Sequence, residues 1–224
     1  MTKIQIKHLL LTCLVVAVSS TAEAQECKEV TTVEPFDQAA YASTWYVQQQ
    51  AVTQYLPESR NYCTKAEYEI LDKATSPWGY TIKVKNSDAD SSGKSRDSPM
   101  DLCAFTPDAN VKSKLKVAPC FLPKIFSGDY WVVAYDESEG YALVSGGQPT
   151  KQGQNGLCTT GTGTNGSGLW IFTRKQERDE TLVNKVRAIA TEAGFDVFVL
   201  NDVDQTNCSS GSEYASGLRG VALD

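Results

Sequence analysis

The chain has 224 residues, a formal net charge of −6 at pH 7 and seven cysteines. This length fits one domain, or two small ones. An acidic chain without a basic cluster is not expected to bind nucleic acid or an anionic membrane surface.

The N-terminal residues have the pattern of a secretory signal peptide. Two lysines precede an apolar run at 9–18, and an A-x-A sequence follows at 22–24. This order predicts a signal peptide at 1–24 and a single mature domain at 25–224. The run is too short for a transmembrane helix of about 20 residues, although an uncleaved anchor is the alternative. We therefore expect a protein that is secreted or resides in the secretory lumen, with no integral membrane segment after cleavage.

Cleavage would change what chemistry is available. It would remove the only histidine, His8, together with Cys13, and leave 200 residues with a net charge of −7. Six cysteines in an oxidising compartment predict three disulfides, without fixing which cysteines pair. No CxxC spacing is present, so we expect no metal site and no cofactor. A mature chain without histidine also excludes Ser-His-Asp and Cys-His catalysis.

Alternating apolar and polar residues predict short strands along most of the mature chain. One helical turn is expected first, at 35–41. The predicted strands lie at 45–52, 64–70, 79–86, 102–105, 113–117, 130–135, 141–144, 169–174 and 195–200. Between them, the polar segments 87–99 and 146–168 predict two long loops.

One amphipathic helix is expected after these strands. Asp179 is a suitable N-cap and Gly194 a suitable end. The apolar residues with helical spacing are Leu182, Val186, Ile189 and Ala193. Because a closed barrel leaves no unprotected edge strand, we predict an all-β fold. It is an eight-stranded up-and-down antiparallel barrel with this C-terminal helix packed on its outer wall.

Three ordered segments resemble the sequence motifs of the lipocalin family. FDQAAYASTWYVQQQ at 36–50 resembles the first motif, with Ser43 in place of the usual glycine. GDYWVVAYDESEGYALVSGG at 128–147 resembles the second but lacks its Thr-Asp-Tyr core, and GLWIFTRKQE at 168–177 resembles the third. VDQTNC at 203–208 resembles the end of the apolipoprotein D and bacterial lipocalin group. The set covers nearly the whole mature chain and implies a lipocalin barrel.

The resemblance implies two structural features. In the family, an arginine stacks over the first-motif tryptophan and closes the base of the barrel, which here means Arg174 over Trp45. A surface arginine at a strand end is the alternative. The family's disulfide pattern implies the bonds Cys27–Cys158 and Cys63–Cys208. The remaining Cys103 and Cys120 flank two adjacent strands, and we expect them to pair outside the common pattern.

Alternation also indicates which side chains face the barrel interior. The charged residues of 65–69 and 83–85 must face water, so their neighbours face inward. On 169–174, an inward arginine places the two aromatic residues inside, and the leucine and isoleucine outside beneath the helix. The predicted cavity residues are Gln49, Tyr68, Ile70, Ile82, Val84, Asn86, Trp170 and Phe172. An apolar chamber with a few polar groups is typical of a small-molecule site, and a barrel filled by its own side chains is the alternative.

These features predict a secreted binding or transport protein for a small hydrophobic ligand of the fatty acid, sterol, retinoid or carotenoid class. One alternative is a protein-binding or defence lipocalin that acts on a protein partner through its long mouth loops. The other is a lipocalin-type enzyme, which we do not expect because even pairing of cysteines leaves no free thiol. Asn165 begins a glycosylation sequon and is therefore expected at the surface.

Overall fold

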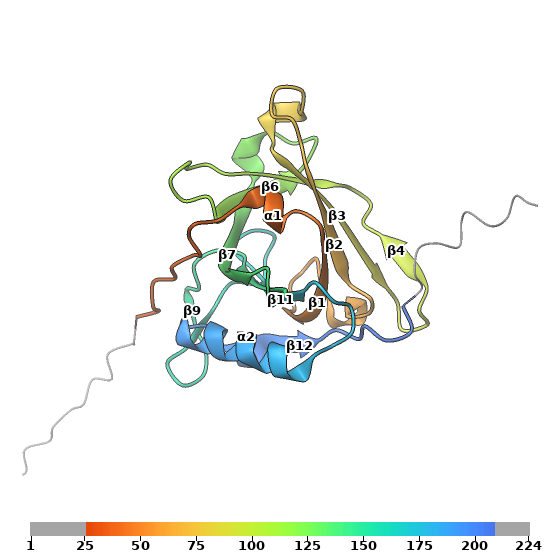
Figure 1. Cartoon of the computed structure of the whole chain (residues 1–224). Coiled ribbons are helices and arrows are strands. Elements are labelled where there is room, and N and C mark those ends of the chain that lie inside the picture. The colour runs from red at the N-terminus through yellow and green to blue at the C-terminus, as the bar shows by residue number, and fades with distance from the viewer. Residues whose placement is uncertain (1–25, 209–224) are drawn as a thin grey trace, which may run out of the picture.

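Eight antiparallel strands close into a barrel in the computed structural model, which describes residues 26–208 (Figure 1). Neighbouring strands pair in chain order, and the last one returns to pair with the first. The barrel strands are β1 (Thr44–Ala51), β2 (Lys65–Ile70), β3 (Ile82–Ala89), β5 (Leu102–Phe105), β6 (Lys114–Pro119), β7 (Gly128–Asp136), β8 (Tyr141–Ser145) and β11 (Leu169–Thr173). The predicted barrel is confirmed, whereas the predicted signal peptide lies outside the described residues.

Two α-helices and several short elements complete the fold. The helices are α1 (Gln38–Tyr41) and α2 (Glu180–Glu192). Single 3-10 turns are η1 (Glu58–Arg60), η2 (Pro77–Gly79), η3 (Lys124–Phe126) and η4 (Val197–Val199). The short strands are β4 (Ser95–Asp97), β9 (Lys151–Gln152), β10 (Cys158–Thr159) and β12 (Leu200–Asp202). In the described part of the chain, no helix has the length and apolarity needed to cross a membrane.

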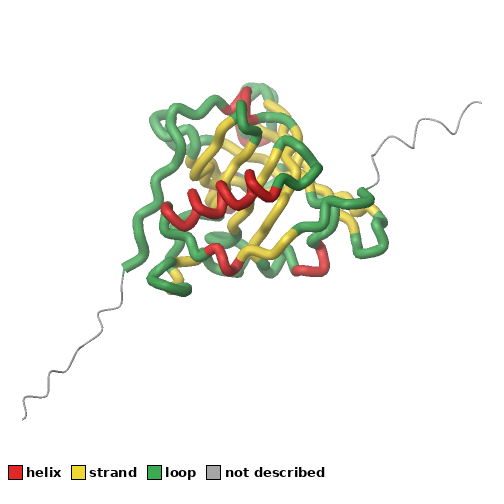
Figure 2. The backbone as a smooth tube through the Cα atoms, turned by 60° about the horizontal axis from the view of Figure 1, so that its bottom comes forward, coloured by secondary structure: helices red, strands yellow, loops and turns green. Residues whose placement is uncertain are grey.

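The helix α2 packs on the outside of the barrel, as predicted (Figure 2). The Asp179 side chain accepts hydrogen bonds from the first-turn amides and so caps the helix. The most deeply buried residues of α2 are Val183, Val186 and Ala190. They pack against outward-facing residues of β8 and β11, including Leu143, Leu169 and Ile171. A second apolar core therefore lies between the helix and the barrel wall, separate from the one inside the barrel.

Three segments differ from the sequence prediction. The segment 87–99 is not one loop: β3 continues into it and pairs with β4, where buried Asp88 forms ion pairs with Arg60 and Arg96. The segment 146–168 contains the β9–β10 hairpin. The strand expected at 195–200 is mostly the turn η4, because Asp196 caps it, and the strand begins only at Leu200.

Three disulfides fix the outer segments to the barrel. They join the same cysteines that were expected to pair, namely Cys27–Cys158, Cys63–Cys208 and Cys103–Cys120. The first two join segments more than a hundred residues apart in sequence, with separations of 131 and 145. They anchor the N-terminal arm and the segment after β12, which also contact the barrel through buried Val30 and Val203.

Candidate ligand-binding site

The closed end of the barrel is built on Trp45 of β1 and Arg174, which follows β11. The guanidinium carbon of Arg174 lies 3.7 Å from the centre of the Trp45 ring, and Trp45 is 0% exposed. The guanidinium also donates hydrogen bonds to three backbone carbonyls between residues 40 and 44, at 2.8–3.2 Å. It forms an ion pair of 2.9 Å with the exposed Glu137. Arg174 therefore binds the segment before β1 to the end of β11.

The short helix α1 brings Tyr41 to this end. Asp37 caps the helix by accepting hydrogen bonds from the amides of Ala39 and Ala40. The Tyr41 carbonyl accepts a hydrogen bond of 3.0 Å from the Trp45 indole. These bonds fix the backbone, so the Tyr41 ring is held among the rings of Trp45 and Tyr68.

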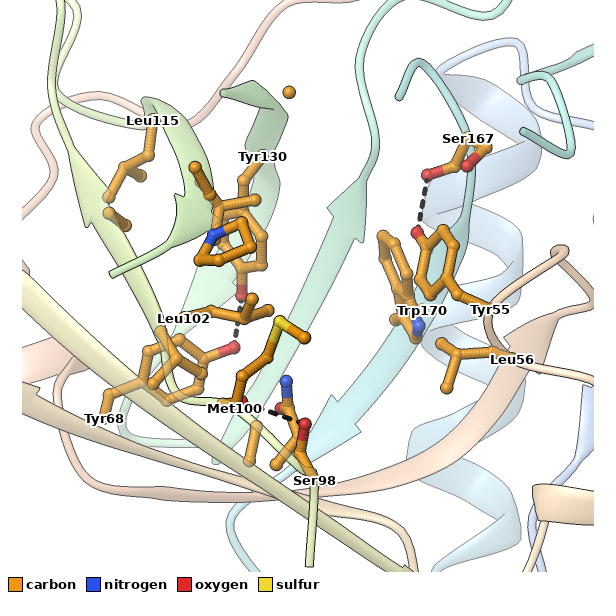
Figure 3. A pocket seen from close by; sticks show the side chains of 18 of the residues that line it. Tyr55, Leu56, Tyr68, Ser98, Met100, Leu102, Leu115, Tyr130, Ser167 and Trp170 are labelled. Atoms are coloured by element: carbon orange, nitrogen blue, oxygen red, sulfur yellow. Dashed lines mark hydrogen bonds between the residues drawn. The ribbon is translucent and has the colours of Figure 1, made fainter. Parts of the chain in front are cut away.

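A cavity of about 500 Å³ lies inside the barrel (Figure 3). Its wall is mainly apolar and includes Val47, Ala66, Leu102, Leu115, Val117 and Phe172. The barrel is therefore not filled by its own side chains. A chamber of this size and lining can enclose a small hydrophobic molecule.

Six of the eight predicted cavity residues lie in the wall. These are Tyr68, Ile82, Val84, Asn86, Trp170 and Phe172. They come from β2, β3 and β11, where charged or helix-covered neighbours mark the outer face. Which of them contact a ligand stays a prediction.

Gln49 was wrongly placed in the cavity. Val47 pairs with Phe172, whereas Gln49 pairs with the next residue of β11, Ile171, so Gln48 is an extra residue in a β-bulge. The bulge reverses the alternation, and Gln50 takes the cavity position instead. The Gln49 amide lies on the outer side, where it donates to Asp202 at 2.6 Å and accepts from Arg187 at 2.7 Å.

Ile70 was also wrongly placed in the cavity. The last backbone contact between β2 and the segment that leads into β1 is the bond from the Tyr68 amide to the Ser43 carbonyl. β2 continues past this point, so Ile70 lies beyond the start of β1 and is 49% exposed. The alternation in β2 is regular, but the barrel wall ends before the strand does.

The glutamines of β1 occupy three different environments. Gln48 donates to the Thr173 hydroxyl at 2.8 Å, and Gln50 donates to the Asn61 side chain at 2.7 Å. Their side-chain oxygens, Gln48 Oε1 and Gln50 Oε1, have no hydrogen-bond partner among residues 26–208. Only Gln50 belongs to the cavity wall.

Two tyrosines of the cavity were missed by the alternation pattern. Tyr41 and Tyr130 both belong to the wall, and the Tyr130 hydroxyl lies 2.6 Å from that of Tyr41 and 2.8 Å from that of Tyr68. Burial is the main cause that raises the pKa of Tyr68 to about 12. Burial likewise raises the pKa of Tyr41 and of Tyr130 well above the ordinary value. All three hydroxyls therefore stay protonated at neutral pH.

The opening of the cavity lies among its exposed wall residues. Tyr55 and Met100 are 40% and 42% exposed, and Phe126 is also exposed. The Tyr55 hydroxyl donates to the Ser167 carbonyl at 3.4 Å, close to the Trp170 ring (Figure 3). Asn165 is exposed at this opening, and its glycosylation stays a prediction.

Comparisons with known proteins agree with this architecture. No family model matches the chain. The sequence is 28% identical over 186 residues to temperature-induced lipocalin-1 of Arabidopsis thaliana, a match that covers 81% of this chain and 86% of that protein.

Two solved structures have a similar fold. Lobster apocrustacyanin A1 matches with a TM-score of 0.52 and 14% identity, over 82% of this chain and 93% of that chain. Insecticyanin of the tobacco hornworm Manduca sexta matches with a TM-score of 0.52 and 18% identity, over 81% and 87%. At these identities the structures support the fold alone. The narrower resemblance to the apolipoprotein D group stays a prediction.

Proposed function

Because this chain belongs to the lipocalin family, by fold and by its resemblance to a plant lipocalin, we propose that it binds and transports a small hydrophobic ligand in its barrel. The observation that carries the proposal is the apolar cavity of about 500 Å³ with an opening between mouth loops. Burial of a ligand's apolar surface there would contribute about 25 cal/mol per Å². Fatty acids, sterols, retinoids and carotenoids all have the required apolar surface.

The test is native mass spectrometry of the protein secreted from eukaryotic cells, followed by organic extraction. The expected result is an additional mass that disappears on extraction and is recovered as a hydrophobic molecule. Loading the extracted protein with that molecule should raise its melting temperature, because a ligand that binds only the folded state stabilises it by mass action. A protein that is ligand-free, and whose melting temperature no member of these four ligand classes raises, would contradict the proposal.

The proposal includes secretion of a single domain, residues 25–224, after removal of residues 1–24. The three disulfides support it, because such bonds persist in oxidising compartments. N-terminal sequencing of the secreted protein should begin at Gln25. A secreted form that begins at Met1 would contradict it.

The proposal does not include catalysis. All six cysteines of the described residues are in disulfides, so none of them offers a thiolate nucleophile. Titration of the folded protein with a thiol reagent should therefore find no free thiol in the mature chain. One reactive thiol per molecule would reopen the enzyme alternative.

A protein partner at the mouth is the second candidate function. The loop between β6 and β7 exposes Phe121, Ile125 and Phe126, and Ile125 is 85% exposed. Phe126 also belongs to the cavity wall, so this apolar surface is continuous with the opening. Replacing Phe121 and Ile125 by serine separates the candidates: a carrier keeps its ligand affinity, whereas a protein binder loses its partner.

A further inference from the structure

Three tyrosine hydroxyls in the cavity wall form a hydrogen-bonded chain. Tyr41 comes from α1, Tyr68 from β2 and Tyr130 from β7. The Tyr130 hydroxyl is the central one, with separations of 2.6 Å to Tyr41 and 2.8 Å to Tyr68. No other described residue forms a hydrogen bond with these three hydroxyls. Among the described residues, the three hydroxyls therefore form hydrogen bonds only with one another.

The three hydroxyls have one more proton to donate than they have well-placed acceptors among themselves. Each neutral tyrosine hydroxyl has one proton to donate. Two hydrogen bonds, of 2.6 Å and 2.8 Å, join the three hydroxyls and use two protons, whichever oxygen donates in each bond. Tyr41 and Tyr68 also interact with each other, but more weakly than either does with Tyr130. The third O–H donor has only this weak contact between Tyr41 and Tyr68 inside a mainly apolar chamber. A buried donor without a partner is unfavourable, so the site favours an occupant that supplies an acceptor.

The surroundings indicate that this acceptor is uncharged. A carboxylate next to the tyrosines would need a cation, because burying an unpaired charge is costly. Arg174, the cation that acts on Tyr41 and Tyr68, lies against the Trp45 ring and is already bound to backbone carbonyls and to Glu137. Two cations of the cavity wall, Arg60 and Lys65, are paired with Asp88 and Glu67. Burial also raises the pKa of all three hydroxyls, which shows that negative charge is disfavoured at this place.

We propose that the Tyr41–Tyr130–Tyr68 chain is a binding site for a neutral oxygen, a carbonyl or a hydroxyl, at the end of the ligand that enters the cavity first. This inference rests on the proposed carrier function and narrows its ligand class. Oxygenated hydrophobic molecules are selected over the corresponding hydrocarbons. A fatty acid binds with its carboxylate outward at the mouth and makes no use of the tyrosines.

The test compares dodecanol, dodecane and dodecanoate as probes of equal chain length, with affinities measured from tryptophan emission of the full secreted chain. The triple variant Tyr41→Phe/Tyr68→Phe/Tyr130→Phe removes all three hydroxyls and leaves the rings. We expect dodecanol to bind about tenfold more weakly to this variant, because its oxygen then has no partner. Dodecane and dodecanoate should bind no more weakly to the variant than to the unmodified protein, because neither of them gives the hydroxyls an acceptor.

Two matched controls follow from the proton count. Tyr68→Phe leaves a two-hydroxyl chain that still has one surplus proton, so it should keep the preference for dodecanol. Tyr135→Phe removes a hydroxyl that bonds to Glu137 outside the cavity, and it should change none of the affinities. Equal weakening of all three probes by the triple variant would overturn the proposal, since it would indicate general loss of packing.

A measurement on the unmodified protein keeps the proposal testable even if the triple variant does not fold. The carbonyl stretching frequency of bound undecyl methyl ketone should lie below its value in hydrocarbon solvent, as expected for a hydrogen-bonded carbonyl. An unshifted frequency would overturn the oxygen site while leaving the carrier function intact. If none of the probes binds at all, the carrier function itself is contradicted.

Discussion

The guanidinium carbon of Arg174 lies over the Trp45 ring, 3.7 Å from its centre, at the closed end of the barrel. This contact joins the first and third family motifs, which are more than a hundred residues apart in the sequence. A desolvated cation over an indole face contributes about 2 kcal/mol or more, and the bonds to backbone carbonyls add to this. Trp45 and Arg174 thus stabilise the fold and do not themselves belong to the cavity wall.

We expect Arg174→Lys to lower the free energy of unfolding by about 1–3 kcal/mol, because lysine cannot stack as a plane and donate in several directions. Urea unfolding measures this change. The matched control is Glu137→Gln, which removes only the exposed ion pair and should cost less than about 1 kcal/mol. Equal effects of the two substitutions would mean that the ion pair, and not the stacking, dominates.

The alternation pattern located most of the cavity because charged side chains mark the outer face of two strands. Lys65, Glu67, Lys83 and Lys85 must contact water, so their neighbours on β2 and β3 face inward. β1 has no such marker, because glutamine can occupy either face when its amide is paired. The sequence therefore gives no sign of the bulge at Gln48. Because of this bulge, Gln50 faces the cavity and Gln49 faces outward, the reverse of the predicted arrangement.

The tyrosine chain could not be predicted for a different reason. Residues 130–135 are apolar on both faces, since one face lines the cavity and the other contributes to the core beneath α2. Alternation therefore leaves Tyr130 unassigned. Tyr41 lies in a helical turn, where strand alternation does not apply. Only the closed barrel brings these two hydroxyls within hydrogen-bond distance.

Gly168→Ala should disturb the cavity wall. Gly168 has φ +101°, and a Cβ atom there would overlap the Trp170 ring. We expect a loss of about 1–3 kcal/mol in the free energy of unfolding, together with a change in tryptophan emission as the ring moves. Gly163→Ala is the control, because a Cβ at that position meets nothing within 4 Å. Unchanged emission in Gly168→Ala would contradict the placement of Trp170.

The raised tyrosine pKa values predict a loss of stability in alkali. Unfolded tyrosines lose their protons near pH 10, whereas burial raises the pKa of Tyr68 to about 12. Above about pH 10 the folded chain binds more protons than the unfolded chain, so the free energy of unfolding falls as pH rises. Below that pH the contribution is fully present. Each such tyrosine adds a slope of up to about 1.4 kcal/mol per pH unit.

Urea unfolding between about pH 9 and 11.5 measures this slope. Tyr68→Phe should make it shallower, because one shifted group is removed. The tyrosinate absorbance of the folded protein should also develop later than that of the unfolded protein. An identical slope in Tyr68→Phe and the unmodified chain would contradict the assignment of Tyr68 to an environment that disfavours charge.

Trp170 should report ligand binding, and the binding of a neutral probe should not depend on pH near neutrality. The Trp170 ring lies in the cavity wall beside Tyr55, so an apolar ligand would displace water from it and change its emission (Figure 3). The only histidine, His8, lies outside the described residues, and the cavity tyrosines stay protonated, so we expect the tyrosine chain to keep the same charge between about pH 5 and 8. The dissociation constant of dodecanol should therefore change less than about twofold over that range. Trp170→Phe should abolish most of the emission change while a ligand-induced rise in melting temperature remains. A tenfold or larger change in affinity across this pH range would mean that a carboxylate with a raised pKa takes part in binding.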